Sequence, residues 1–226
     1  TKEILSQLGV EIRKISVTGS LKDSRNKLTV DKNDLKKFKK VIGSQKVWVA
    51  ASTHPGEDEV ILKAHKKIGG ILLIAPRHID RAKQIVRLSS SLGFKTQLRS
   101  EQSDIKAETA VYIADTMGEM GLWYSLTSVA FIGGSLVEKG GHNPIEAAQF
   151  NTYILHGPNT YNALERYEQL RQAGICCLVQ DASELVKEIL RIQNLRRKFN
   201  FDLNSIFDPE YALNEALNEI KLVTNY

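Results

Sequence analysis

A glycine-rich segment, residues 131–146, carries the residues best suited to binding an anion. It reads FIGGSLVEKGGHNPIE, with glycine pairs at 133–134 and 140–141 ahead of an Asn-Pro step at 143–144. Asn is a favoured helix N-cap and Pro a favoured first helical residue, so we expect a helix to begin there. The free N–H groups of a helix start suit phosphate, and glycines let the backbone come close to it. The alternative is a tight packing loop, but four glycines, the cap and Glu146 favour binding.

A second polar group follows the apolar run 46–51 and contains Ser52, Thr53 and His54. Hydroxyl and imidazole groups can bind an anion, so these three residues are candidate ligand contacts. The acidic residues 57–59 suit the positive end of a helix dipole and predict a helix start. A purely structural interpretation, with Ser52 or Thr53 as the helix cap, fits the pattern equally well.

Two further polar groups follow apolar runs. Pro76 and Arg77 come after residues 71–75, and an arginine at a strand end can fork onto a phosphate or a carboxylate. The alternative for Arg77 is a surface ion pair. Residues 117–119, Met-Gly-Glu, come after the run 110–114 and offer backbone N–H groups where another helix is expected. A lone Met is more often a core residue than a ligand contact.

The elements that must position these groups are short apolar strands alternating with amphipathic helices. Strands are predicted over residues 46–51, 71–75, 94–98, 110–114, 128–132, 152–155 and 175–179. Helices are predicted over residues 57–68, 79–92, 119–126, 145–150, 162–173 and 183–194. This alternation predicts an α/β fold, a Rossmann-like parallel sheet with helices on both faces. Ligands of such sheets bind at the carboxyl ends of the strands, where the four polar groups would converge.

Composition and charge narrow the function classes. The 226 residues are 42% hydrophobic and 25% charged, which is ordinary for a soluble globular domain, and the net charge is +5. Lysines gather in residues 32–40, which we interpret as a solvated helix face; attraction to nucleic acid or acidic lipid is the sharper alternative. The adjacent Cys176 and Cys177 would point to opposite faces of a strand, so no disulfide is expected, and a reducing compartment fits. No dinucleotide fingerprint, P-loop, metal-ligand spacing or catalytic triad is present.

The polar groups, taken together, resemble the 3-deoxy-D-manno-octulosonic acid (Kdo) transferases. The similarity runs in order from about residue 12 to about residue 192, with Met120 and Ile145 standing where the family pattern has Leu. The segments that carry the resemblance are TGSLK at 18–22, STHPGE at 52–57, PRH at 76–78, DTMGE at 115–119 and GGSLVEKGGHNPIE at 133–146.

The resemblance implies the carboxyl-terminal half of a GT-B glycosyltransferase, the half that holds the sugar donor CMP-Kdo. The whole enzyme would transfer Kdo to a lipid A precursor in lipopolysaccharide synthesis, at the cytoplasmic face of the bacterial inner membrane. It would use no metal and no cofactor. The family's general base and acceptor site belong to the amino-terminal half, so no catalytic residue is expected in this chain, which we expect to be soluble and to bind the donor without transferring sugar.

The resemblance also implies residue roles. The positions expected to bind CMP are Pro76, Arg77, Met117, Gly118, Glu119, Asn143, Pro144, Ile145 and Glu146. Further donor contacts are expected at Ser52, Thr53, His54, Gly133, Gly134, Ser135, Gly140, Gly141 and His142. In this scheme Arg77 neutralises an anionic group, Glu146 accepts hydrogen bonds from the ribose, and the Met117-Gly118 backbone reads the cytosine.

Three segments are expected along the chain, and two other functions stay open. Residues 1–26, with a strand-like run at 12–18, would lead in from the other half; residues 27–199 would form the CMP-sugar domain, and residues 200–226 would hold a final helix at 209–223. One alternative is another GT-B glycosyltransferase or an epimerase that uses a UDP-sugar. The other is a non-enzymatic nucleotide-binding module, or a nucleic-acid-binding one, against which the glycine loop counts because it suits one small anion.

Overall fold

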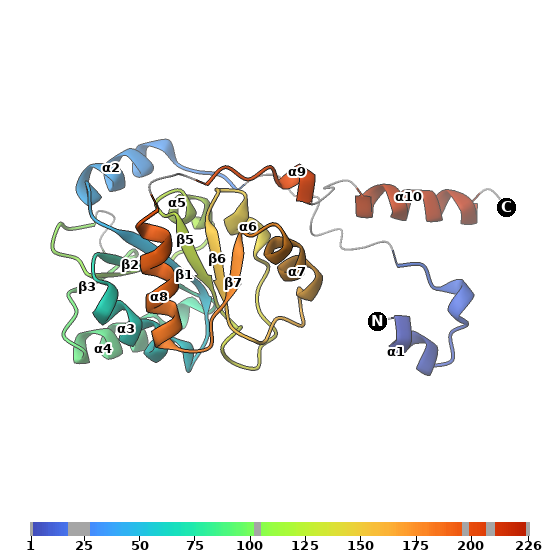
Figure 1. Ribbon diagram of the computed structural model, residues 1–226, viewed down its shortest axis with the longest axis horizontal. Coiled ribbons are helices and arrows are strands. Elements are labelled where there is room, and N and C mark those ends of the chain that lie inside the picture. Colours follow the sequence, from blue (N-terminus) through green and yellow to red (C-terminus); the bar gives the residue numbers. More distant parts are fainter. Residues whose placement is uncertain (1, 18–27, 102–104, 196–198, 207–210, 225–226) are drawn as a thin grey trace. The chain divides into compact units, whose positions relative to one another are not determined.

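The computed structural model describes residues 2–17, 28–101, 105–195, 199–206 and 211–224 (Figure 1). The chain divides into two compact units, residues 27–201 and residues 1–26 together with 202–226. The described elements of the smaller unit are α1 (Lys2–Gln7), η1 (Ile12–Lys14), α9 (Leu203–Ile206) and α10 (Tyr211–Thr224). The final helix is therefore confirmed. The strand-like run at 12–18 is wrong in its described part, which begins with a 3₁₀ turn; a strand there would need a partner for its backbone groups.

The larger unit is built on a seven-stranded sheet in the order β3-β4-β2-β1-β5-β6-β7. Its strands are β1 (Val47–Thr53), β2 (Ile71–Pro76), β3 (Thr96–Leu98), β4 (Val111–Ile113), β5 (Val129–Ile132), β6 (Tyr153–His156) and β7 (Cys176–Leu178). Every pairing is parallel. The predicted parallel α/β sheet is confirmed, and all seven carboxyl ends lie at one edge.

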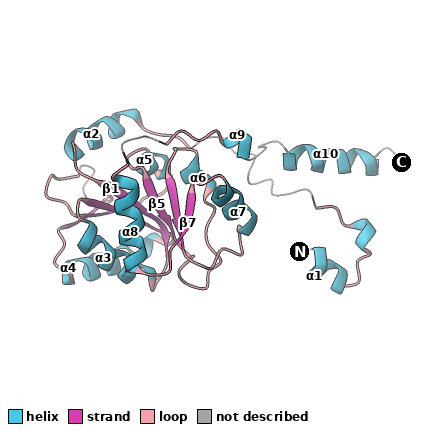
Figure 2. Ribbon diagram, viewed as in Figure 1, coloured by secondary structure: helices cyan, strands magenta, loops and turns pink. Residues whose placement is uncertain are grey.

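Helices cover both faces of this sheet (Figure 2). They are α2 (Lys32–Ile42), α3 (Glu57–Ile68), α4 (Ala82–Ser91), preceded by η3 (Ile79–Arg81), α5 (Met120–Tyr124), α6 (Ile145–Ala148), α7 (Leu164–Gln172) and α8 (Ala182–Gln193). On one face α3 packs against both α4 and α8. On the other, Phe38 of α2 contacts Tyr112 of β4 and Trp123 of α5 edge-on, with ring centroids 5.5 and 5.3 Å apart.

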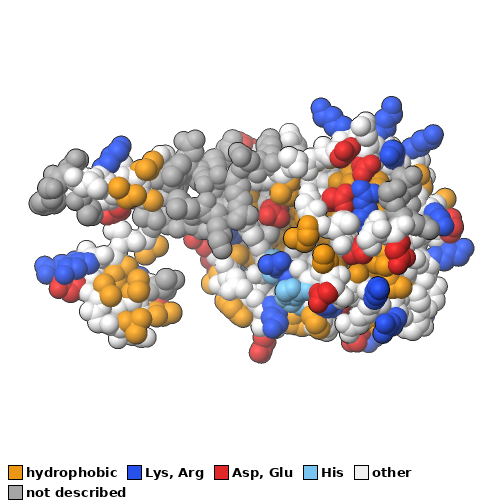
Figure 3. Space-filling model, turned by 180° about the vertical axis from the view of Figure 1, so that it is seen from behind, with side chains coloured by type: hydrophobic (Ala, Val, Ile, Leu, Met, Phe, Trp, Pro, Cys, Tyr) orange, Lys and Arg blue, Asp and Glu red, His pale blue; other side chains and the backbone are white. Residues whose placement is uncertain are grey.

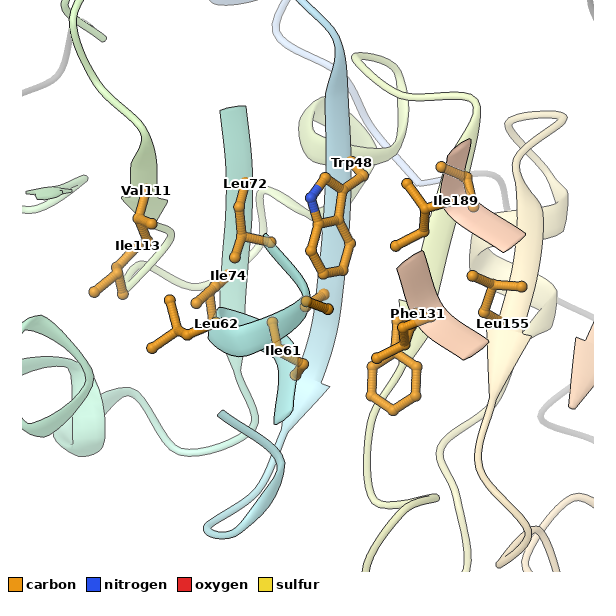
Figure 4. Close-up of a cluster of buried hydrophobic side chains, with 14 of the residues drawn as sticks. Trp48, Ile61, Leu62, Leu72, Ile74, Val111, Ile113, Phe131, Leu155 and Ile189 are labelled. Atoms are coloured by element: carbon orange, nitrogen blue, oxygen red, sulfur yellow. The ribbon is translucent and has the colours of Figure 1, made fainter. Parts of the chain in front are cut away.

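The main core lies between the sheet and the face that carries α3, α4 and α8 (Figure 4). Trp48, Leu72 and Phe131 point into it from three strands, because side chains at alternate positions of a strand share a face, and Ile61 enters it from α3. All four side chains are fully buried. Burying each such side chain contributes about 2 kcal/mol relative to leaving it exposed. This core fixes the strands rigidly, so the loops at their carboxyl ends start from defined positions.

A buried histidine, His65 of α3, completes this core. Its Nδ1 accepts a hydrogen bond of 3.1 Å from Trp48 Nε1, which leaves Nε2 to carry the proton and donate to the carbonyl oxygen of Ala110 at 2.9 Å. Burial lowers the pKa of His65 to about 4. His65 is therefore a neutral residue with both ring nitrogens satisfied.

The order of the strands predicts where a ligand crevice opens. From β1 the chain moves to β2 on one side, and later returns to β5 on the other side of β1. Loops that leave β1 and β5 therefore diverge to opposite faces of the sheet, and the space outside their carboxyl ends is where doubly wound sheets bind ligands.

Candidate functional site

The carboxyl ends of β1 and β5 press closely together. Ser52 has φ +55°, in the left-handed region that non-glycine residues rarely adopt, and the pairing of β1 with β2 shifts register between Ala51 and Thr53. A Cβ placed on Gly133, the residue after β5, would lie 2.4 Å from the carbonyl oxygen of Ser52. Only glycine at position 133 therefore allows the backbones of β1 and β5 to approach this closely, and the space beside its Cα is filled by Ser52 and Thr53.

The glycine loop that follows β5 already holds an anion, the side chain of Glu57. The Glu57 carboxylate is fully buried and accepts four backbone N–H bonds: from His54 at 2.9 Å, Gly134 at 2.8 Å, and Ser135 and Leu136 at 3.0 Å each. Burial raises the pKa of Glu57, and the four donors oppose that effect. The N–H groups of Gly134 and Ser135 are therefore engaged by the protein itself, and the Gly133 N–H bonds within the sheet, to the Ala51 carbonyl oxygen. The donor contacts expected at these three residues stay a prediction.

The structural alternative for Ser52 and Thr53, a helix cap, is wrong. The N-cap of α3 is Gly56, which has no side chain to accept a bond. Thr53 Oγ1 instead donates to Asp58 at 2.9 Å, and Asp58 pairs with Arg81, whose Nη1 donates to the Thr53 carbonyl oxygen at 3.0 Å. Asp58, in the acidic first turn of α3, thus fixes the ends of β1 and η3 through these contacts.

Three histidines gather at this edge. His54 Nε2 and His142 Nε2 lie 2.8 Å apart, and their rings are parallel within 2° with centroids separated by 5.1 Å. His78 stands edge-on to His54 at 5.8 Å. Burial, and then the positive charge of neighbouring groups, lowers the pKa of His54 to about 4 and also lowers that of His142. The pair is therefore neutral at pH 7.

Arg77 and His78 follow β2 and reach the same place. The Arg77 N–H bonds to the Thr53 carbonyl oxygen at 3.0 Å, which ties the β2 end to the β1 end. The Arg77 side chain is exposed, and among the described residues it has no ion-pair partner, so the surface ion pair considered above is not formed. Its charge acts on His142, in the loop after β5. Residues after β1, β2 and β5 thus meet at one edge of the sheet. We call it the cationic edge, because Arg77 and Lys139, the latter in the loop after β5, carry positive charge there.

The Asn-Pro step after the glycine loop is positioned differently from the prediction. Helix α6 covers only Ile145–Ala148 and its N-cap is Pro144 rather than Asn143. Asn143 Oδ1 still accepts a bond from the Ile145 N–H at 3.0 Å. Residues 149–152 connect the carboxyl end of α6 to β6. Glu146 is half-buried on α6 and interacts with other groups of the chain.

The remaining glycines shape the loop that carries His142. Gly140 and Gly141 have φ values of +81° and +70°. The Gly141 and His142 N–H groups donate to the Gly134 and Gly133 carbonyl oxygens, and Tyr167 donates its hydroxyl to the His142 carbonyl oxygen at 2.7 Å. These bonds position His142 against His54.

The segment 117–119 lies after β4, at the same edge of the sheet. Glu119 is bound by Arg99, with Nε at 3.1 and 3.2 Å and Nη2 at 2.6 Å, and by the Thr116 hydroxyl. Arg99 also binds Asp34 of α2 at 2.5 Å. The Glu119 carboxylate is thus engaged by the protein. Met117 is 74% exposed, so the alternative of a core residue is wrong, and neither it nor Gly118 donates its N–H within the described residues.

The structure therefore brings together Arg77, His54 and His142 from the predicted set. Sequence reasoning missed two residues of the cationic edge, His78 and Lys139, and gave Glu57 only a role at the start of a helix. All three act across neighbouring strands, and spacing along the chain gives no sign of such contacts. The segment 18–22 lies outside the described residues. Within the described ranges no three His, Cys, Asp or Glu side chains form a metal-binding group. None of the helices seen in those ranges has the length and apolar character needed to cross a membrane.

Comparison with known proteins adds independent findings. No protein-family model matches the chain. It is 35% identical to a 3-deoxy-D-manno-octulosonic acid transferase of Haemophilus influenzae, over 95% of this chain and 53% of that protein. It is 32% identical to a bifunctional glycosyltransferase/methyltransferase of Fusobacterium nucleatum, over 97% of this chain and 35% of that protein. The chain thus spans about a third to a half of these relatives.

A solved structure is also similar. The C-terminal CMP-Kdo binding domain of WaaA from Acinetobacter baumannii matches with a TM-score of 0.66 and 28% identity. The match covers 82% of this chain and 95% of that domain.

Proposed function

The chain belongs to the family of 3-deoxy-D-manno-octulosonic acid transferases, and on that premise we propose that it binds the activated sugar CMP-Kdo. Its sheet is the Rossmann-like, carboxyl-terminal domain of a GT-B glycosyltransferase. The observation that carries the proposal is the exposed Arg77, which has no ion-pair partner among the described residues and lies beside His78, His54 and His142 where the strand order reverses. CMP-Kdo brings a phosphate and a sugar carboxylate to such an edge.

In the proposed complex, side chains rather than loop N–H groups hold the anionic part of the donor. Arg77 is exposed and uncommitted among the described residues, so it can fork onto the phosphate or the carboxylate. The unbonded N–H groups of Met117 and Gly118 suit the cytosine, and the segment 143–146 suits the ribose.

The same charges would act on the reaction. When the bond between Kdo and the phosphate breaks, negative charge grows on the departing CMP. Cations already aimed at that position stabilise the transition state, and one well-placed donor contributes roughly 3 to 4 kcal/mol in enzymes where this has been measured. Arg77 is the residue of this chain best placed for that role.

The whole enzyme would extend beyond these residues. We propose that it transfers Kdo to a lipid A precursor in lipopolysaccharide synthesis at the inner membrane, with the acceptor site and general base in the other half. On this basis the isolated chain binds the donor without transferring the sugar. The mixed distribution of basic and acidic side chains on the face in Figure 3 offers no continuous basic stripe for nucleic acid.

Calorimetric titration of the chain with CMP and then UMP, without divalent metal, tests the proposal. We expect CMP to bind more tightly, and Arg77→Ala to weaken CMP by roughly tenfold to a hundredfold through loss of a charge-assisted contact. Arg87→Ala, an exposed arginine on α4, is the matched control and should leave CMP affinity unchanged. A preference for UMP would instead support a UDP-sugar enzyme and would overturn the assignment.

A further inference from the structure

The cationic edge has no counter-ion within the described residues. The positive charges of Arg81 and Lys139 act on His54, and the positive charge of Arg77 acts on His142. Arg81 is paired with Asp58, but the side chains of Arg77, His78 and Lys139 have no ion pair in the described part of the chain. An arrangement that collects positive charge in this way is stabilised by an anion from outside.

The carboxylates of the surrounding elements do not supply that anion. Glu57 of α3 is held by four N–H groups, and Asp58 by Arg81 and Thr53. Asp80 of η3 and Glu138 of the loop after β5 are exposed, and neither pairs with these cations among the described residues. From α7, the group that reaches the pair is the Tyr167 hydroxyl, which bonds to the His142 backbone. On the face shown in Figure 3, histidine reaches the surface beside lysine or arginine side chains.

The contact between the two histidines limits how many protons they can take. At 2.8 Å, one Nε2 must carry a hydrogen and the other must accept it. One extra proton can enter at the Nδ1 of the donating ring, which strengthens the bond into a charge-assisted one. A second extra proton would place two N–H groups face to face at Nε2. The geometry therefore permits the uptake of one proton.

We propose that the His54–His142 pair is a proton-coupled part of the anion subsite, which takes up one proton when a phosphate or carboxylate docks against Arg77 and His78. The inference rests on the proposed function, because it assigns the anionic group of the donor to this place. Glu57 and Tyr167 act as positioning residues, since they fix the two segments that carry the rings.

The sign of the pH dependence follows from charge. In the free protein the lowered pKa values of His54 and His142 leave the pair neutral at pH 7. A bound anion raises the pKa of the pair, so protons are taken up on binding, and affinity rises as pH falls toward 5. A full proton corresponds to about tenfold in affinity per pH unit. The CMP phosphate also titrates, with a second pKa of about 6, so a matched variant is needed.

The test is calorimetry of CMP binding at pH 6.5 in buffers of different ionisation enthalpy, with His142→Gln as the matched variant. Gln keeps a hydrogen-bonding group but does not titrate, and the contribution of the phosphate is common to both proteins. We expect the native chain to take up as much as one proton more than the variant per CMP bound. His Cε1–H NMR titration of the native chain, free and with CMP, measures the same pKa rise without any substitution.

Separate titrations with CMP and with free Kdo identify the anion, and they distinguish failure of this inference from failure of the proposed function. A pKa rise with CMP alone assigns the subsite to phosphate, and a rise with free Kdo alone assigns it to the sugar carboxylate. If CMP binds with no excess proton uptake and neither CMP nor Kdo raises the pKa of the pair, the inference fails while the proposed function stands. If CMP does not bind, the proposed function loses its support, and inorganic phosphate becomes the probe. Unchanged His54 and His142 pKa values would then overturn the inference as well.

Discussion

Two regions at the carboxyl edge of the sheet are built to hold an anion, and they differ in what fills them. In the loop after β5, three N–H groups converge on the buried Glu57 carboxylate, which is part of the chain itself. Beside it, Arg77, His78 and Lys139 have no ion-pair partner among the described residues. The first region is complete without a ligand, whereas the second is not. A glycine loop after a strand therefore identifies an anion site, but not whether the anion is a ligand.

Removing the internal anion should have the largest effect. We expect Glu57→Ala to lower the free energy of unfolding by on the order of 4 kcal/mol, because it leaves buried N–H groups without an acceptor. Glu57→Gln should lose about half as much, since an amide still offers one acceptor oxygen. Chemical denaturation measures both, with exposed Glu59→Ala on the same turn as control. A loss under 1 kcal/mol for Glu57→Ala would mean that the loop is not held by this carboxylate.

A pair of glycine substitutions separates the closed region from the open one. In Gly133→Ala the new methyl group meets the Ser52 carbonyl oxygen at 2.4 Å, and we expect a loss of about 3 kcal/mol. In Gly118→Ala no atom lies within 4 Å of the methyl group, so the loss should be the roughly 1 to 2 kcal/mol of a positive φ. Thermal unfolding of the two variants gives the order, and equal losses would contradict the close approach of β1 and β5.

Acid should destabilise the fold through its neutral histidines. His54 and His65 each have a pKa of about 4 in the folded chain, against about 6.5 when unfolded, so the unfolded state binds more protons between these values. Stability is fully present above pH 6.5 and is lost as pH falls toward 4. His65, in the core, should remove about 2 kcal/mol between pH 6.5 and pH 5, and His54, at the edge of the sheet, should remove less.

Urea unfolding at several pH values measures this slope. His65→Gln should flatten it, because the core contribution is then absent at every pH. Bound CMP should flatten only the contribution of His54, which faces the open region. An identical slope in His65→Gln would show that the core histidine is not protonated on unfolding.

The smallest effect is expected for Glu119→Gln. The substitution weakens the contacts with Arg99 and should lower the free energy of unfolding by about 1 kcal/mol, with a modest change in CMP affinity. Loss of CMP binding with unchanged stability would instead show that Glu119 contacts the ligand rather than stabilising the fold.

The fold was largely predictable because its signals are local. The acidic start and glycine end of α3 gave bounds of 57–68, which the structure reproduces. Alternation of strands and helices predicted the parallel sheet. The strand order was not predictable, since nothing along the chain states that β5 pairs with β1. The run at 12–18 has strand-like residues but no partner strand in its described part.

The site was predicted at the level of segments rather than atoms. Arg77, His54 and His142 come together as expected, because motifs after neighbouring parallel strands must converge. The role of Glu57 was hidden, since three of the four N–H groups that its carboxylate accepts lie 77 to 79 positions away along the chain. A favourable local explanation, the acidic first turn of α3, masked the long-range one.

The contacts of Glu57 also bear on the order in which the chain folds. The carboxylate cannot meet its donors until β5 has docked on β1, which closes a loop of nearly 80 residues. Because the entropy of closing so long a loop opposes these contacts, we expect them to form after the rate-limiting barrier has been crossed. Substituting Glu57 should therefore accelerate unfolding far more than it slows folding, as stopped-flow rates in denaturant would show. The buried carboxylate would then limit the rate at which the native sheet unfolds, and so set its lifetime.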